Sequence, residues 1–441
     1  MKKAIVIGGG AAGIAAACRL AECGIRVLLL ERSPRMGGRA ASFNHHRMGE
    51  EIDYGQHILM RCCTDTIELL DDLGVLEHVF FQPRLRVPIV CGTKRAMLAS
   101  TPLPGPLHLV PSLLGYRLVN LSERLGLARA GLAFLAQDPP ENLAFSEWLQ
   151  DNGQGPRAIR RLWNPICVAT LNDHAETVSA SAAAMVIKEG FLRPCGAAIG
   201  LFTAPLSRIF SAAMPFIQAR GGTVRLKAPV EKILIEHGRA CGVQLTSGDQ
   251  IPAEGMVVAV PPPNLLPLLP QESAEEPYFA AMTQLHWSPI VNLHLWYDRP
   301  VMDESFLIAV ESPVQAIFDV SRIRGSAGPT HIVLSQSAAQ QWINLSNDEI
   351  RDQLLSALEK LLPAIRTARL LDALVIKHPR ATFLPAPRSE SLRPKTQTPI
   401  DRLFLAGDFT ATGWPSTLEG AVRSGKIAAK RLIQSFSPEQ L

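Results

Sequence analysis

The 441-residue sequence predicts an α/β fold in which a Rossmann-like dinucleotide-binding domain is interleaved with an α+β second domain. The first observation is a unit at residues 5–31, where an apolar run, a glycine-rich turn, a small-residue helix and a second apolar run follow one another. The second is a strand-like segment at 402–408 that ends in Gly-Asp and precedes an Ala-rich helix. The stretches between them alternate between helical and strand-like patterns, which favours a discontinuous layout.

The turn at residues 8–13 has the G-x-G-x-x-G spacing of a phosphate-binding loop. Gly8 allows the tight turn, Gly10 lets the backbone approach a pyrophosphate, and Gly13 lets the helix pack close to the strand. Amide groups at the start of the helix, that of Ala12 included, then face the phosphates.

The acidic residue after the second apolar run narrows the choice of dinucleotide. Glu31 follows Gly13 by eighteen residues, where a carboxylate accepts hydrogen bonds from ribose hydroxyls and repels a 2′-phosphate. FAD or NAD is therefore favoured over NADP. In the next stretch, which begins at Arg32, Gly37 and Gly38 permit a second close approach of the backbone to the ligand. Arg39 follows them and can bind phosphate through its guanidinium group. This second element favours FAD.

The C-terminal block supports the same cofactor. Gly407 and Asp408 end a strand where a carboxylate can hold the ribityl chain, and residues 414–417 are predicted to form a wall beside the flavin ring. No Cys, His or Tyr occurs from residue 400 onward, so we expect noncovalent FAD. The predicted FAD-binding residues are Gly8, Gly10, Ala12, Gly13, Glu31, Arg32, Gly38, Arg39, Val230, Gly407, Asp408, Trp414, Pro415, Ser416 and Thr417.

Composition excludes some function classes. A net charge of +4 with no long Lys/Arg run gives no electrostatic case for nucleic acid binding. Only 19% of residues are charged, which favours an apolar substrate or contact with a membrane surface. The eight cysteines contain no C-x-x-C pair, so we expect reduced thiols in the cytoplasm, no disulfide and no metal.

Residues 103–135 are rich in Leu, Pro and Gly but contain Arg117, Glu123, Arg124 and Arg129. This pattern is not that of a transmembrane helix. We expect helices packed inside the second domain, with a peripheral contact on the inner face of the membrane as the alternative.

Periodicity and turn residues divide the chain as follows. We expect a strand returning to the cofactor at 43–57, helices at 64–73, 206–219 and 347–362, a mainly helical region at 103–200, and strands at 224–226, 230–236, 240–246, 256–260, 290–297 and 332–336. The FAD-binding domain is predicted to comprise residues 1–80, 205–275 and 390–441, and the substrate domain residues 81–204 and 276–389.

The blocks at 8–39, 230–261 and 406–421 resemble the FAD-binding signature of the flavin amine oxidase and carotenoid desaturase superfamily. More narrowly, the chain resembles the squalene-associated FAD-dependent desaturases, also described as hydroxysqualene dehydroxylases. One departure is the sequence Met-Arg-Cys-Cys at 60–63, where that family has a Gly-Cys-Tyr-like continuation. The matching stretches are 53–57, 103–109, 162–165, 169–172, 288–290, 294–296 and 414–417.

The resemblance implies reductive removal of the hydroxyl group of hydroxysqualene, an allylic C30 alcohol, to give squalene in squalene and hopanoid biosynthesis. Such chemistry needs an acid, a dry apolar tunnel and a reduced flavin that delivers hydride to an allylic cation. His57 is the candidate acid, and its alternative role is to hydrogen-bond the flavin or backbone. Gln56 is a candidate for binding the flavin edge or the hydroxyl.

Further polar and aromatic residues are candidates for lining the pocket. Asn164, Asn172 and Asp173 interrupt an apolar helical region, where helix capping explains them equally well. The indoles of Trp163, Trp287 and Trp296 either face a polyene cation or belong to the core.

Three alternatives remain open. The same fold serves an oxidative carotenoid-type desaturase of isoprenoids or an amine oxidase, and a noncatalytic flavin-binding protein is the third possibility. No second G-x-G-x-x-G follows a strand, so no NADPH-binding domain is expected and the electron donor of a reductive reaction is unidentified. The expected partners are therefore an isoprenoid small molecule and this donor.

Overall fold

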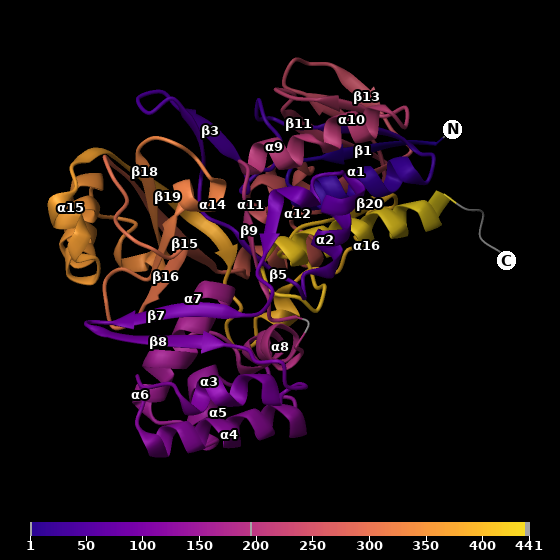
Figure 1. Ribbon diagram of the computed structural model, residues 1–441. Coiled ribbons are helices and arrows are strands. Elements are labelled where there is room, and N and C mark those ends of the chain that lie inside the picture. The colour runs from indigo at the N-terminus through magenta and orange to yellow at the C-terminus, as the bar shows by residue number, and fades with distance from the viewer. Residues whose placement is uncertain (1, 195, 437–441) are drawn as a thin grey trace.

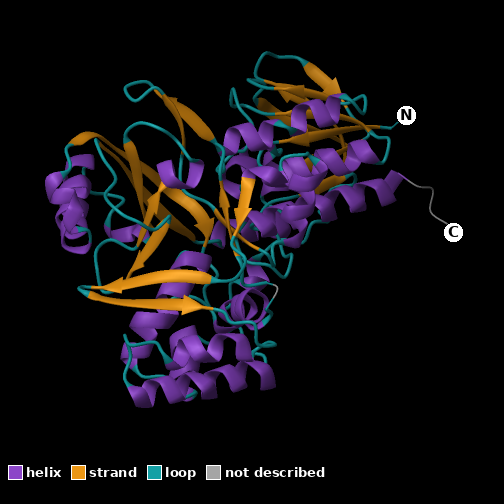
Figure 2. Cartoon of the chain, viewed as in Figure 1, coloured by secondary structure: helices purple, strands orange, loops and turns teal. Residues whose placement is uncertain are grey.

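The structure is a computed structural model that describes residues 2–194 and 196–436. Figure 1 shows three regions: a parallel sheet with its helices at upper right, a second sheet on the left, and a helical layer at the lower end. Figure 2 shows that strands dominate the first two regions and helices the third. This mixed content, with a parallel sheet, confirms the predicted fold class.

Within the described residues, a five-stranded parallel sheet forms the centre of the first region. The predicted unit at 5–31 is confirmed as two neighbouring strands joined by a helix, α1 (Ala11–Glu22). The neighbours in this sheet come from both ends of the chain, which is why the glycine turn and the C-terminal block meet. The strand order is β10 (Thr223–Arg225), β2 (Arg26–Leu30), β1 (Lys3–Ile7), β14 (Gly255–Val258), β20 (Leu403–Leu405).

The helix α1 packs against the C-terminal helix α16 (Leu418–Phe436) so closely that the backbones of the two helices are almost in contact. A Cβ on Gly425 would lie 2.1 Å from the carbonyl oxygen of Ala12, so only glycine permits this approach. The buried alanines of α1 and the apolar face of α16 belong to one hydrophobic core. The two ends of the chain are therefore held together by packing.

The predicted strands between 224 and 260 are present, but only β10 and β14 join the parallel sheet. The others form a separate antiparallel sheet of β11 (Val230–Glu236), β12 (Arg239–Leu245) and β13 (Gln250–Pro252). The helix predicted at 206–219 is wrong in one respect, because it is divided at Ala212 into α9 (Leu206–Ser211) and α10 (Ala213–Gln218). Pro215 lacks the N–H that a continuous helix would need at that point.

The second region is a mixed sheet, seven-stranded in the described part of the chain. Odd-numbered residues of its longest central strand, such as Leu293 and Leu295, share a core with the helix α15 (Asn347–Leu361). Even-numbered residues, such as Asn292 and His294, therefore face the other side. The strand order is β19 (Leu370–Phe383), β15 (Trp287–Tyr297), β18 (Thr330–Gln336), β17 (Ala316–Asp319), β16 (Phe306–Ala309), β7 (Arg86–Cys91), β8 (Lys94–Ala99).

The third region confirms the mainly helical prediction for 103–200. Its core contains an aromatic cluster in which the ring of Phe134 lies 4.5 Å from that of Trp148 and 5.8 Å from that of Trp163. Among the described residues no helix is long and apolar enough to cross a membrane. The helices are α3 (Val110–Leu114), α4 (Leu121–Ala136), α5 (Phe145–Asp151), α6 (Pro156–Ala158), α7 (Asn164–Leu171) and α8 (Ala180–Val186), with π-helical turns at Ile159–Trp163 and Ile187–Leu192.

Short elements connect the three regions. The strand predicted at 43–57 is a hairpin of β3 (Ser42–His45) and β4 (Glu50–Asp53), after which the chain continues without regular structure along the site. A small sheet then joins β5 (Ile58–Met60), β9 (Ile199–Phe202) and β6 (Val79–Phe81). The remaining helices are α2 (Thr64–Asp72), α11 (Pro262–Leu265), α12 (Gln271–Ala274), α13 (Pro277–Ala280) and α14 (Val320–Arg324).

Two of these details bear on the predicted domain boundaries. β9 belongs by sequence to the predicted substrate domain but pairs with β5 and β6, which lie at or beside the predicted FAD-binding segment. Phe279 and Met282, predicted to begin the second substrate segment, pack in one core with Ile5 and Ile7 of the parallel sheet. The division of the chain into two domains stays a prediction.

Candidate functional site

A single cavity of about 1020 Å³ runs from the glycine turn to the second sheet and the helix α7. This volume reaches the upper end of the range for small-molecule sites, so it can accommodate an extended ligand or two adjoining ones. Its lining includes fifteen of the eighteen predicted site residues: Gly8, Gly10, Ala12, Glu31, Arg32, Gly38, Arg39, Gln56, His57, Asn164, Val230, Gly407, Asp408, Ser416 and Thr417. Gly13, Trp414 and Pro415 lie outside the lining.

The glycine turn brings backbone into contact with backbone. A Cβ on Gly13 would lie 1.9 Å from the carbonyl oxygen of Gly8, and Gly8 has a positive φ of 106°. Gly13 therefore acts from beneath the turn, by letting α1 approach it. Gly10, the residue before α1, makes no side-chain cap, so the first amide groups of the helix are available to an anion.

Glu31 fixes the shape of this turn. Its Oε2 accepts a hydrogen bond from the Gly9 amide at 2.6 Å, and its Oε1 accepts one from the Ser33 amide at 2.7 Å. The side chain is buried yet still contributes to the cavity wall. Each carboxylate oxygen has a further lone pair, so the predicted bond to a ribose hydroxyl is compatible with this structural role.

Arg39 and Asp408 connect the two ends of the chain across the cavity. They form an ion pair, and Arg39 Nη1 also donates to the carbonyl oxygen of Ala381 at 2.7 Å. Burial alone would raise the pKa of Asp408, but the charge and hydrogen bond of Arg39, with the hydroxyl of Ser416, lower it. The carboxylate is therefore ionised, and the guanidinium predicted to hold phosphate is already shared with it.

The block at 414–417 is divided between the cavity and the protein interior. Ser416 donates to Asp408 Oδ2 at 2.5 Å, and Thr417 follows it on the cavity wall. Trp414 instead lies against the guanidinium of Arg423, with 4.2 Å between the carbon of that group and the ring centre. The wall beside a flavin would thus consist of Ser416 and Thr417, while the predicted contact of Trp414 has no support in this arrangement.

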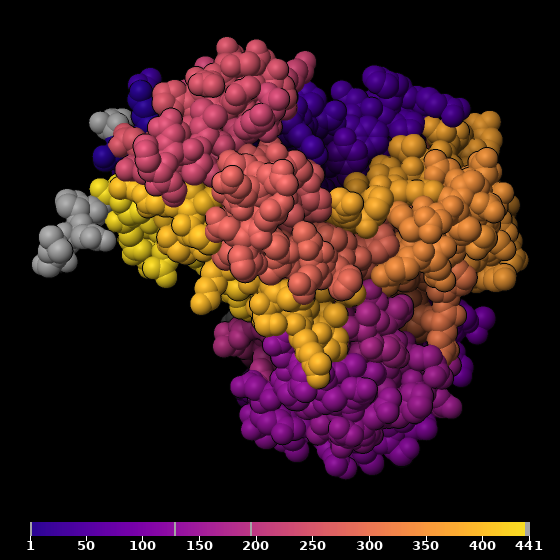
Figure 3. All heavy atoms as spheres, turned by 180° about the vertical axis from the view of Figure 1, so that it is seen from behind, coloured from indigo at the N-terminus to yellow at the C-terminus, as the bar shows by residue number. Residues whose placement is uncertain are grey.

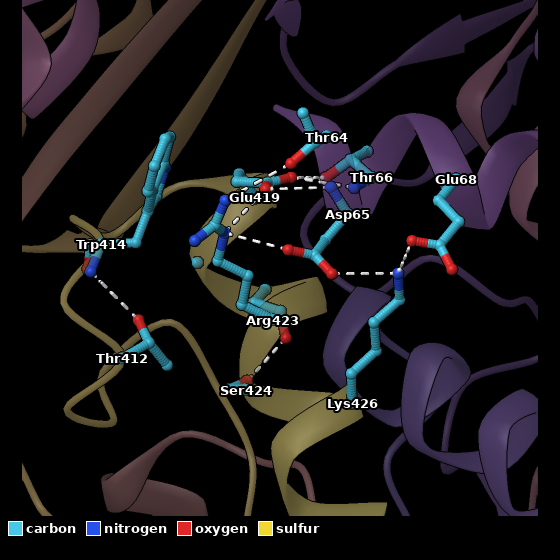
Figure 4. A network of polar contacts seen from close by, with 12 residues as sticks. Thr64, Asp65, Thr66, Glu68, Thr412, Trp414, Glu419, Arg423, Ser424 and Lys426 are labelled. Atoms are coloured by element: carbon cyan, nitrogen blue, oxygen red, sulfur yellow. Dashed lines mark hydrogen bonds and ion pairs between the residues drawn. The ribbon is translucent and has the colours of Figure 1, made fainter. Parts of the chain in front are cut away.

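Figure 4 shows the network of polar contacts that holds this block in position. Glu419, which is fully buried, accepts hydrogen bonds from the Thr66 amide at 2.8 Å and from Arg423 Nε at 2.8 Å. It also accepts from the Asp65 amide at 3.1 Å, so its carboxylate caps the start of α2. The network connects α2 to α16 immediately behind the cavity wall.

His57 and Gln56 lie on the cavity wall in the segment after β4. Burial lowers the pKa of His57, against the opposing charge of Asp53 and a hydrogen bond with the backbone of Arg39. The imidazole is therefore neutral at neutral pH, which makes it a poor resident acid. Among the described residues, Gln56 Nε2 is a buried donor without a hydrogen-bond partner.

The predicted polar residues of the helical region differ in their contacts. Asn164 lines the cavity while its Oδ1 accepts from the Ala175 amide at 2.8 Å. Asn172 ends α7 in the left-handed conformation, and its Nδ2 donates to the carbonyl of Ser288 at 3.1 Å. Asp173 accepts from the His174 amide at 2.8 Å. Asn172 also lines the cavity, so it agrees with both the lining and the capping alternatives. Asp173 is not part of the lining and accepts from the Ser288 hydroxyl at 3.3 Å, so both residues connect the end of α7 to the second sheet.

Only one of the three candidate tryptophans reaches the cavity. Trp287 is part of its lining. Trp163 is buried in the aromatic cluster and donates from Nε1 to Gln154 at 3.0 Å, and Trp296 is buried against His331. For these two the structure supports the core alternative.

The sequence did not identify several residues that the fold brings to the cavity. Asn292 contributes a buried Oδ1 that has no hydrogen-bond partner in the described part of the chain, and its Nδ2 donates to the Tyr54 carbonyl at 3.2 Å. His378 lies nearby, with Nε2 3.3 Å from the same carbonyl. Burial lowers its pKa as well. The available signal was a polar residue, Asn292, within an otherwise apolar strand pattern.

Known proteins agree with this architecture. The model of the family of flavin containing amine oxidoreductases matches residues 11–433, and the chain belongs to that family. It is 27% identical to a 15-cis-phytoene desaturase of Narcissus pseudonarcissus over 98% of this chain and 79% of the relative. It is 25% identical to a 15-cis-phytoene desaturase of Synechococcus elongatus over 97% of this chain and 95% of the relative.

Solved structures show the same fold. An oxidoreductase from Methanosarcina mazei superposes with a TM-score of 0.80 at 19% identity, covering 97% of this chain and all of the other. Cyclohexylamine oxidase from Brevibacterium oxydans superposes with a TM-score of 0.70 at 18% identity, covering 98% and 99%. The protein is a flavin-dependent oxidoreductase whose cofactor is FAD. The glycine turn, which a Cβ at Gly13 would obstruct, and the ionised Asp408 fit that cofactor.

Proposed function

We propose that this flavoprotein removes the hydroxyl group of hydroxysqualene reductively and yields squalene. The sequence stretches that resemble hydroxysqualene dehydroxylases contribute to one cavity, through Asn164 and Pro165, through Ala169 and Thr170, and through Ile290. Apolar side chains such as Val168 and Phe318 line the same space. A long hydrocarbon chain with one polar group suits this combination.

The observation on which the proposal depends is that two residues of the wall, Gln56 and Asn292, each hold a buried polar atom without a partner in the part of the chain that the structure describes. Gln56 Nε2 is a donor and Asn292 Oδ1 is an acceptor, and both are buried without a partner among the described residues. Asn292 lies against the backbone of Gly55, next to Gln56, since a Cβ on Gly55 would be 2.8 Å from Asn292 Nδ2. An alcohol oxygen can accept from the first and its hydrogen can donate to the second. A pure hydrocarbon satisfies neither group.

Bound FAD in its reduced form supplies the hydride that replaces the hydroxyl, after reduction by an unidentified donor. The C–O bond breaks, the oxygen leaves as water once it has gained a proton, and a C–H bond forms with the hydride. Gln56 and Asn292 orient the oxygen, and the apolar walls exclude water from the carbon cation that is left.

His57 fits the transfer of the proton rather than its storage. Because burial lowers its pKa, the protonated ring is rare but is a stronger acid than an ordinary imidazolium. In this proposal the ring takes up a proton at the nitrogen that is not bonded to the Arg39 backbone and passes it to the hydroxyl. The rate of dehydroxylation should therefore rise as the pH falls below neutrality.

Anaerobic mixing of the reduced holoenzyme with hydroxysqualene tests the reaction. Squalene should form in proportion to flavin reoxidation, measured by mass analysis and by the return of the yellow absorbance. Gln56→Met should slow this step at least about tenfold, the equivalent of one lost hydrogen bond, without loss of bound FAD. Gln341→Met, at an exposed glutamine of the same cavity, is the matched control and should keep the wild-type rate. Absence of squalene, or a Gln56→Met rate equal to wild type, contradicts the proposal.

Oxidative desaturation of an isoprenoid is the second candidate. It is favoured by the neutral His57, which can accept the proton that desaturation releases, and by the desaturase names of the relatives. Mixing the oxidised holoenzyme with 15-cis-phytoene distinguishes the two reactions. Bleaching of the flavin together with a shift of the polyene absorbance to longer wavelength supports desaturation, whereas no spectral change excludes it.

A further inference from the structure

Exposed apolar side chains are concentrated on the helical layer. Of the twelve large hydrophobic residues that are exposed among those described, eight lie between 103 and 135. Isolated exposed leucines are ordinary on protein surfaces, but a cluster of this kind marks an interaction site. We call this set the leucine surface: Leu103, Leu107, Val110, Leu114, Leu121, Leu125, Leu132 and Leu135.

The helix α4 provides half of the leucine surface. Its four members occupy positions i, i+4, i+11 and i+14, which fall on one side of a helix with 3.6 residues per turn. The opposite side of α4, with Leu127 and Phe134, is buried in the core of the layer. Figure 1 shows α4 as the outermost helix at the lower end of the molecule, and Figure 3 shows the layer as a separate bulge. Among the described residues, no element covers the outer side of α4.

The unpaired charges within 103–135 are positive, and Asp138, which follows this segment, is paired with Lys188. Arg117 and Arg129 are exposed, and neither forms an ion pair with a described residue. Glu123, the only acidic residue between 103 and 135, is bound in the cap of α4, where its Oε2 accepts from the Asn120 amide at 2.8 Å. The leucine surface is therefore apolar with a cationic edge, which is complementary to phosphate groups above a hydrocarbon layer.

We propose that the leucine surface docks onto a lipid bilayer that contains anionic headgroups. The leucines of α4 lie at the boundary of the acyl chains, with the long axis of the helix in the membrane plane, and Arg117 and Arg129 contact lipid phosphates. A second copy of this chain fits less well, because a two-fold interface contains these arginines from both copies, and the leucine surface itself offers no free carboxylate to pair with them.

The docked layer is one helix away from the cavity. Phe134 on the inner side of α4 packs against Trp163, and the next residue, Asn164, lines the cavity. Docking would thus hold the cavity close to the phase in which an apolar ligand dissolves. Vesicle binding itself can be measured without any substrate, so it can fail or succeed independently of the proposed reaction.

Cosedimentation of the holoenzyme with vesicles tests the proposal. The protein should bind vesicles of equimolar phosphatidylcholine and phosphatidylglycerol more tightly than vesicles of phosphatidylcholine alone, and added salt should weaken the difference. The double variant Leu121→Gln, Leu132→Gln should lower the partition coefficient at least about tenfold. Arg117→Gln with Arg129→Gln should lower it about fivefold per arginine on the anionic vesicles only.

The matched control is Leu370→Gln with Ile427→Gln, which alters two exposed apolar residues outside the leucine surface. This variant should bind vesicles as the wild type does, and all variants should retain FAD and their circular dichroism. Wild-type protein that stays in the supernatant, or leucine variants that bind normally, would overturn the proposal. Light scattering adds one further outcome: if the leucine variants convert a dimer to a monomer and vesicles are not bound, the surface is an interface between copies and the proposal is wrong.

Discussion

Gly13→Ala is the most direct test of how the glycine turn is built. The added Cβ would lie 1.9 Å from the carbonyl oxygen of Gly8, whereas real Cβ atoms essentially never approach a heavy atom closer than 3.0 Å. The start of α1 must therefore move by at least the difference, 3.0 − 1.9 = 1.1 Å. The obstructing atom is backbone, so no side-chain rotation can relieve the contact.

Two effects of opposite sign compete in this variant. Alanine favours a helix over glycine by about 1 kcal/mol, while forced overpacking costs about 1–3 kcal/mol and more when backbone must shift. We expect the steric effect to win and the phosphate-binding turn to be displaced. FAD affinity should fall at least about tenfold, since about 1.4 kcal/mol corresponds to that factor.

The assay is titration of the apoprotein with FAD, followed by flavin fluorescence, together with thermal unfolding. Gly131→Ala is the matched control, because this glycine is also in a helix, α4, and an added Cβ there meets nothing within 4 Å. The control should bind FAD normally and unfold at the same or a higher temperature. Normal FAD binding by Gly13→Ala would refute the argument that backbone contact at Gly13 shapes the site.

Two further predictions concern buried charged and titratable groups. Glu419→Gln removes the fully buried charge that pairs with Arg423, so it should lower the free energy of unfolding by about 2–4 kcal/mol and weaken FAD binding. Glu68→Gln changes an exposed side chain of the same network and should alter the free energy of unfolding by less than about 1 kcal/mol. Thermal unfolding of both variants measures this difference, and equal effects would contradict the prediction. Burial, followed by the charge of His45, lowers the pKa of His294 to about 3. Between about pH 6.5 and pH 3, the unfolded chain therefore binds a proton at this residue that the folded protein does not bind. The free energy of unfolding consequently falls as the pH falls through this range. The slope should be about 1.4 kcal/mol per pH unit for this residue, and His294→Gln should reduce it in urea unfolding between pH 7 and 5, while His46→Gln at an exposed histidine should not.

Local sequence patterns were sufficient for the elements that short-range physics determines. The strand, glycine turn and helix at 5–22 follow from the steric needs of a phosphate loop, and Asn172 ends α7 in the left-handed conformation that asparagine tolerates. The division of the helix at Ala212 was also visible in principle, because Pro215 lies inside it. The sequence analysis nevertheless predicts one helix, because the spacing of apolar residues before and after Ala212 follows the same helical period.

Contacts between distant segments could not be read from the sequence. Trp414 is predicted beside the flavin, but its ring lies against Arg423, a contact that no local pattern indicates. Arg39 is predicted as a phosphate ligand, but its ion pair with Asp408 could not be predicted, because 369 residues separate the two. Asn292 came to attention only when its strand was seen to border the cavity.

The strand order of the parallel sheet has a consequence for how the protein acquires its shape during synthesis. β1 pairs with β14, and β14 in turn pairs with β20. The first strand therefore cannot complete its pairing until residues 255–258 have been synthesised, and the edge of the sheet cannot form until residues 403–405 have been synthesised. A nascent chain on the ribosome therefore exposes an unfinished sheet for most of its translation. Such long-range pairing slows folding and invites aggregation. Heterologous expression should accordingly benefit from slow translation and from chaperones that shield strand edges.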